Sequence, residues 1–214
     1  LETHIIGQAR VLSKHGIELY LATGSANIDC PDDVFAGMLT GLPIGAKMTY
    51  EELLSTLEQI DEFISSQRIT HIHAHPFYSI IVGLLAAYRS KLPFVMTIHG
   101  PYALNGVFDY GDLFYFLLKN VCFPVASRVF CVSKEVELLC RSLGKCETEL
   151  LPNAVEIPEV NFSSKIVNAW MWAGRIDEHK YHGLIDLIEK VDVLFVNELH
   201  IYGDGPKVQE VKKF

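Results

Sequence analysis

Apolar and polar positions along the chain follow two periods, one typical of β-strands and the other typical of α-helices. Short apolar runs bounded by Gly, Pro or polar residues predict strands, whereas apolar residues three or four positions apart predict amphipathic helices. The predicted helices cover residues 1–14, 49–66, 77–89, 108–121, 133–142 and 183–190. The predicted strands cover residues 17–22, 70–74, 93–98, 128–132, 147–151, 167–173 and 199–202. Because strands that alternate with helices form βαβ units, we expect an α/β fold with a doubly wound parallel sheet.

A proline-punctuated segment, residues 151–158, divides this pattern and is typical of a linker. The sequence therefore predicts an N-terminal Rossmann-like domain over residues 1–152, and a linker with a second Rossmann-like domain over residues 153–214. The second domain offers two clear strands, fewer than a free-standing domain of this type needs, so we expect it to be incomplete. Residues 23–47 are rich in Gly, Pro and Asp and are predicted to be irregular.

Charge and cysteine content narrow the class of protein. A net charge of -8 argues against a nucleic-acid groove, which needs clustered Lys and Arg. The longest apolar stretches, residues 77–88 and 113–126, are too short or too interrupted by charge to span a bilayer. Cysteines occur at five scattered positions without a Cys-x-x-Cys pair: Cys30, Cys122, Cys131, Cys140 and Cys146. We expect small buried thiols in a cytoplasmic protein, with peripheral membrane contact through residues 113–126 left open.

Cations and glycines follow the two strands of the second domain, at the end where ligands bind in open parallel sheets. Arg175 and Lys180 stand between a strand and a helix, where a guanidinium fork, an ammonium and a helix N-terminus suit a diphosphate. The alternative is a pair of solvated charges balanced by Asp177 and Glu178. The turn Gly203-Asp204-Gly205-Pro206 lets the backbone approach a ligand closely, although a purely structural turn fits equally well.

Histidines follow two strands of the first domain. His99 comes directly after an apolar strand, where its imidazole could bind a sugar hydroxyl or serve a structural purpose. His71, His73 and His75 alternate along one strand and share a face, which gives poor tetrahedral geometry for zinc. We predict no metal site. The chain also has no Asp-x-Asp pair to hold a metal on a diphosphate, so the two cations of the second domain would take that role.

Together these motifs resemble the family 4 retaining glycosyltransferases of the GT-B fold, over essentially the whole chain. The resemblance rests on Leu1-Glu-Thr-His-Ile-Ile-Gly-Gln-Ala-Arg-Val-Leu12, Thr97-Ile-His99-Gly100, Val132-Ser133-Lys134, Leu151-Pro-Asn153-Ala-Val155, Gly174-Arg175-Ile-Asp-Glu-His-Lys180 and Ile201-Tyr-Gly203-Asp-Gly205-Pro206. The family's glycine-rich loop would precede Leu1 and its glutamate-flanked motif would follow Phe214, so we expect truncation at both ends and weak activity for these residues alone. Tyr181 stands where glycine is common in the family.

The resemblance implies transfer of a sugar from a nucleotide-diphosphate sugar to an acceptor hydroxyl, in glycan biosynthesis, with retained anomeric configuration and without a metal or other cofactor. Arg175 and Lys180 would stabilise the leaving diphosphate, and His99 would orient the donor sugar. The implied donor-binding residues are Gly174, Arg175, Lys180, Gly203, Asp204 and Gly205. The implied acceptor-side residues are Glu2, Thr3, His4, His75 and Tyr102.

The acceptor would be a glycan, a lipid-linked molecule or a small molecule. Two other functions stay open at this point. One is a sugar-nucleotide epimerase or hydrolase on the same two-domain architecture. The other is a non-catalytic sugar-binding or scaffold protein with a decayed site.

Overall fold

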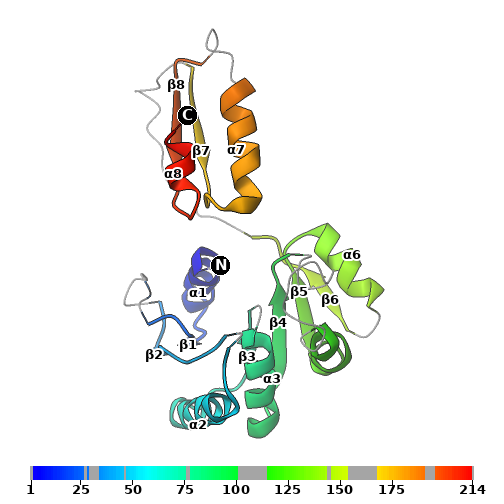
Figure 1. Ribbon diagram of the computed structural model, residues 1–214. Helices are drawn as coiled ribbons and strands as arrows, with labels where there is room; N and C mark the ends of the chain where they lie inside the picture. The colour runs from blue at the N-terminus through cyan, green and yellow to red at the C-terminus, as the bar shows by residue number, and fades with distance from the viewer. Residues whose placement is uncertain are drawn as a thin grey trace. The chain divides into compact units, whose positions relative to one another are not determined.

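The chain divides into two compact units, Leu1–Glu156 and Ile157–Phe214 (Figure 1). The computed structural model describes residues 2–26, 28, 34–45, 47–75, 78–100, 115–143, 146–153, 168–190 and 196–213. From the sequence, we expect the acceptor domain to end at residue 152 and the donor part to follow it. This assignment of function to the two parts stays a prediction. Each unit contains parallel strands and helices, which confirms the expected α/β class.

A four-stranded parallel sheet forms the centre of the first unit. Its strands pair in the order β3 (Ile72–Ala74), β4 (Phe94–Ile98), β5 (Arg128–Cys131) and β6 (Thr148–Leu150). A separate parallel pair consists of β1 (Tyr20–Ala22) and β2 (Gly37–Leu39). The prediction that residues 23–47 are irregular is wrong at β2. This strand is three residues long, too short to show a hydrophobic period among its Gly and Pro neighbours.

The helices of the first unit begin and end close to the predicted bounds. They are α1 (Glu2–Lys14), α2 (Tyr50–Gln67), α3 (Tyr78–Ser90) and α6 (Lys134–Ser142). A capping box starts α2, because the amide of Thr49 donates to Glu52 Oε2 at 2.7 Å and the amide of Glu52 donates to Thr49 Oγ1 at 3.2 Å. Ser133 caps α6 by accepting from the amide of Val136 at 3.3 Å.

The predicted helix over residues 108–121 falls partly outside the described residues, and its described part ends later than expected. Residues 115–117 are helical, and they continue through a π-helical turn, η2 (Leu118–Cys122), into α5 (Phe123–Val125). The wider turn ends two residues before Pro124, which has no amide hydrogen for an ordinary helical bond. The helix therefore continues through the proline to Val125.

The core of the first unit lies between the four-stranded sheet and its helices. Met96, Ile98 and Val129 of the sheet and Ile80 of α3 are fully buried. The same core contains three of the four described cysteines, and the fourth packs against it: Cys122, Cys131, Cys140 and Cys146. None of these four forms a disulfide, as the sequence predicts. Cys30 lies outside the described residues.

The second unit is built on two parallel strands, β7 (Ala169–Ala173) and β8 (Glu198–Tyr202), with Ala173 opposite Tyr202. Its helices are α7 (Glu178–Lys190) and α8 (Val208–Val211). The predicted start of α7 near Gly183 is wrong, because Asp177 caps the helix earlier. Its Oδ1 accepts from the amide of Lys180 at 3.3 Å.

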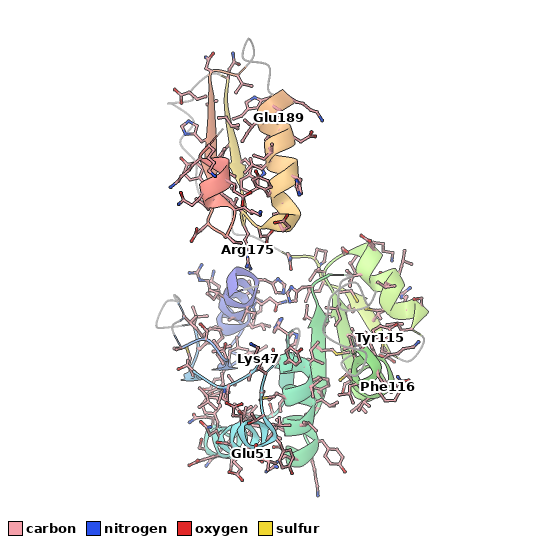
Figure 2. The ribbon with its side chains drawn as sticks, in the orientation of Figure 1. Lys47, Glu51, Tyr115, Phe116, Arg175 and Glu189 are labelled. Atoms are coloured by element: carbon pink, nitrogen blue, oxygen red, sulfur yellow. The ribbon has the colours of Figure 1, made fainter. Side chains whose placement is uncertain are left out.

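No helix in the described part of the chain is long and apolar enough to cross a membrane. The segment 115–125 nevertheless exposes three apolar side chains, Phe116, Val121 and Val125; Phe116 is labelled in Figure 2. The predicted membrane contact through this segment stays a prediction.

Candidate functional site

In the first unit, histidines from two neighbouring strand ends lie in direct contact. β3 and β4 pair in parallel with Ala74 opposite Met96, so the residues that follow the two strands lie at the same edge of the sheet. His75 follows β3 and His99 follows β4, with His75 Nδ1 at 3.0 Å from His99 Nε2. Because imidazole has both a donor and an acceptor nitrogen, one ring donates to the other and fixes its orientation.

His4 joins this pair from the first turn of α1. Its side chain is 8% exposed, and its ring meets that of His99 edge-on with centroids 4.8 Å apart. Among the residues that the structure describes, its Nε2 has no hydrogen-bond partner. One ring nitrogen from each of His4, His75 and His99 lies within 4.8 Å of those of the other two. We call these three residues the histidine cluster.

The strand histidines do not act as one set. His73 stacks on His75 with ring centroids 4.5 Å apart, and its Nε2 lies 2.7 Å from Oγ1 of the fully buried Thr97. His71 is exposed and lies 3.0 Å from Thr70 Oγ1. The close grouping of His75 with His4 and His99 therefore comes from three elements, which alternation along one strand could not reveal.

Burial keeps the histidine cluster neutral near pH 7. It lowers the pKa of His99 to about 4 and that of His75 to about 2, and repulsion between neighbouring imidazoles adds to the effect. Burial also lowers the pKa of His4 below its ordinary value. The cluster can therefore offer hydrogen bonds and lone pairs, but it carries no charge for a phosphate.

In the second unit, the turn after β7 carries both predicted phosphate ligands. The Arg175 side chain is 74% exposed and pairs with Asp177 through Nε at 3.3 Å from Oδ2; Figure 2 labels it at this turn. Lys180 is exposed in the first turn of α7, and its stem passes over Gly174. Within the described part of the chain, no carboxylate forms an ion pair with the ammonium of Lys180.

Of the two acidic residues expected to balance these cations, only Asp177 does so. Asp177 does pair with Arg175, but Glu178 pairs instead with Lys207, at 3.1 Å. Lys207 also pairs with Glu210 at 2.8 Å and lies over the Tyr181 ring at 5.4 Å from its centroid. The side chain that replaces the family's usual glycine thus contacts a cation that the sequence prediction missed.

Both carboxylates raise the pKa of Lys207 above its ordinary value, with Glu210 the larger cause. The negative charges of the two carboxylates offset the charge of Lys207, so it attracts an anion less strongly than an unpaired lysine would. One sequence pattern could have identified Lys207. It is a Lys directly after a Gly-x-Gly-Pro turn, with acidic residues at the start of the neighbouring helix.

Packing requires the two glycines of the turn that follows β8. Gly203 and Gly205 both have φ of 153°, where L side chains are strained. A Cβ on Gly203 would overlap the carbonyl oxygen of Gly174, and one on Gly205 would overlap that of Ile176. The amide of Ile176 also donates to the carbonyl of Asp204 at 2.9 Å. The two turns therefore form one compact structure, while their donor-binding role stays a prediction.

The remaining predicted residues lie partly outside the description. Glu2 and Thr3 belong to the first turn of α1, but their side chains are not among those described. Tyr102 lies outside the described residues. Asp204 is exposed, and its Oδ1 accepts from the amide of Gly205 at 2.7 Å.

The family model for Glycosyltransferase Family 4 matches residues 1–158. The chain belongs to glycosyltransferase family 4. Among solved structures, MurG of Acinetobacter baumannii is similar with a TM-score of 0.53 and 14% identity, over 98% of this chain and 58% of that one. S. aureus MnaA, solved with UDP, is similar with a TM-score of 0.52 and 14% identity, over 92% of this chain and 64% of that one. No curated protein gives a match.

These similarities give this family 4 chain the GT-B fold, and it spans less than two thirds of either solved chain. The family match covers the histidine cluster, but it ends before the turns at residues 174–180 and 203–206. For those turns the comparison supports the fold alone.

A pair of glycine substitutions tests the packing of the two turns. We expect Gly205→Ala to lower the free energy of unfolding of the second unit by about 1–3 kcal/mol, because the residue needs positive φ and has no room for a Cβ. Gly183→Ala, in the open interior of α7, should raise it by about 0.5–1 kcal/mol. Urea unfolding followed by tryptophan fluorescence reports on this unit, because both tryptophans, Trp170 and Trp172, lie in β7. Equal stability of the two variants would contradict the packing.

Proposed function

We propose that this family 4 glycosyltransferase moves a sugar from a nucleotide-diphosphate sugar to an acceptor hydroxyl with retained anomeric configuration. Family membership supports the reaction class. The observation that carries the donor assignment is the turn between β7 and α7, where an exposed guanidinium and an exposed ammonium flank a helix N-terminus. UDP in the similar MnaA structure makes a nucleoside diphosphate a reasonable probe.

The two cations of this turn are available to a phosphate. Arg175 is exposed and Asp177 is half-buried, so loss of the pair costs on the order of 1 kcal/mol. A diphosphate brings more charge than a carboxylate and accepts two parallel bonds from a guanidinium, so it can replace Asp177 as the partner of Arg175. Asp177 would remain the cap of α7 through its bond to the amide of Lys180. The N-terminus of this 13-residue helix adds partial positive charge.

This charge acts on the leaving group. The bond between the anomeric carbon and the diphosphate oxygen breaks, the acceptor oxygen bonds to the same carbon, and negative charge collects on the diphosphate. Arg175 and Lys180 stabilise that charge without a metal ion. The departing phosphate takes the proton of the acceptor hydroxyl, so the reaction needs no separate base.

The first unit contributes the sugar-orienting group in this proposal. His99 is neutral and its ring is fixed by His75, so it hydrogen-bonds a sugar hydroxyl without attracting the diphosphate. Glu2, Thr3, His4, His75 and Tyr102 form the proposed acceptor side. A sugar-nucleotide epimerase or hydrolase would place acid and base carboxylates at the sugar. The match to the family 4 model favours the transferase.

We further propose a cytoplasmic enzyme that contacts the membrane surface peripherally and takes a glycan, lipid-linked or small-molecule acceptor. The exposed Phe116, Val121 and Val125 support the surface contact. Cys122, Cys131 and Cys140 are buried and form no disulfide, which supports a reducing compartment. The net charge of -8 gives no support for a nucleic-acid partner.

Removal of either cation should weaken donor binding. We expect Arg175→Ala and Lys180→Ala each to lower the affinity of the full chain for its nucleoside diphosphate by about 10-fold or more, and the transfer rate by about 10²–10³-fold. Calorimetry with UDP, GDP and ADP measures the first effect. Lys190→Ala is the matched control, because this lysine lies in the last turn of the same helix and pairs with Asp186. Unchanged binding in both turn variants would refute the donor assignment.

The stereochemistry of the product tests the reaction itself. Proton NMR of the product should give the same anomeric configuration as the donor, and an inverted product would rule out the proposed mechanism.

His99→Ala should lower the transfer rate by about 10²-fold while nucleoside-diphosphate affinity stays unchanged, because the imidazole contacts the sugar. His71→Ala serves as the control, since its side chain is exposed and bonded to Thr70.

A further inference from the structure

The histidine cluster has the composition and spacing of a transition-metal site. Its three imidazoles come from α1 and from the ends of β3 and β4, and their ligand nitrogens lie within 4.8 Å of one another. Nitrogens bound to one tetrahedral Zn²⁺ at about 2.0–2.1 Å are roughly 3.3 Å apart. His75 Nδ1 and His99 Nε2, at 3.0 Å, are already close to that spacing. The His4 nitrogen, within 4.8 Å of the other two, would have to move closer to complete the set.

A second observation points to a ligand at this place. His4 is 8% exposed, and its Nε2 has no hydrogen-bond partner within the described residues. A buried polar atom without a partner costs about 1–3 kcal/mol, so it calls for an explanation, and a bound water or ion is one. The unpartnered nitrogen belongs to the same residue whose ring meets His99 edge-on. A metal ion between the three rings would satisfy it.

We propose that His4, His75 and His99 together bind one divalent transition-metal ion of the Zn²⁺ class. Three protein nitrogens leave a fourth position of a tetrahedral ion open to water or to an oxygen of a bound molecule. An all-imidazole set selects Zn²⁺, Co²⁺, Ni²⁺ or Cu²⁺ over Mg²⁺ and Ca²⁺, which prefer oxygen. The site differs from one that holds a metal on a diphosphate. It uses three histidines that the proposed function places at the sugar and the acceptor, so a bound ion would offer its open position to an oxygen there.

The surroundings favour this use of the cluster. His73 stacks on His75 and is itself held by the buried Thr97, so the His75 ring has a fixed support. The sequence predicts no metal site because it considers only the three histidines that alternate along one strand, His71, His73 and His75. The folded chain instead combines residues from three elements.

Metal titration of the full chain tests this site. After treatment with EDTA, the protein should bind one equivalent of Zn²⁺ in competition with a chromogenic chelator, and excess Mg²⁺ should not displace it. Co²⁺ should give the intense visible absorption of a tetrahedral site. His4→Ala and His75→Ala should each weaken Zn²⁺ binding by about 10–100-fold and abolish the Co²⁺ spectrum. Far-UV circular dichroism checks whether each variant is folded. If one is not, the milder His75→Gln takes its place.

Two control variants exclude binding at other histidines. His71→Ala removes an exposed imidazole before the same strand, and the double variant His182→Ala/His200→Ala removes two exposed imidazoles that face Glu178 and Glu198. All of these should keep full Zn²⁺ affinity. The proposal is overturned if the wild-type chain binds no Zn²⁺, if the cluster variants bind it as tightly as the wild type, or if the control variants lose it equally.

Discussion

The parallel pairing of β3 with β4, and of β7 with β8, brings the residues that follow each strand to one edge of a sheet. In the first unit this pairing joins His75 to His99. In the second unit it sets the turn after Ala173 against the turn after Tyr202. Every candidate group depends on these registers, because a shift of one residue would turn each side chain to the opposite face. The buried apolar side chains of the sheet hold the first register in place.

The two units use this geometry for different chemistry. The first collects neutral imidazoles in a largely buried place, suited to hydrogen bonds with a sugar or to coordination of a divalent transition-metal ion. The second collects exposed cations at a helix N-terminus, suited to a phosphate. Its glycines lock two turns together, while Lys207 is neutralised by Glu178 and Glu210. Arg175 and Lys180 therefore remain the cations of this turn region with the most charge to offer.

Much of the fold could be predicted from the sequence because its signals are local. The capping box at Thr49 and the cap at Ser133 identify helix starts, and the apolar run of β4 identifies a central strand. The errors have local causes as well. β2 is too short to show a period, and the cap formed by Asp177 starts α7 ahead of its apolar stripe. The histidine cluster and Lys207 needed the folded chain, since their partners are distant in sequence.

Binding of a nucleoside diphosphate at the β7–α7 turn can be tested most directly by a crystal structure of the full chain with the tightest binder among UDP, GDP and ADP. Phosphate oxygens should lie within hydrogen-bond distance of the Arg175 guanidinium and the Lys180 ammonium, with Arg175 released from Asp177. A diphosphate bound elsewhere, with Arg175 still paired to Asp177 and Lys180 in solvent, would contradict the proposed donor site.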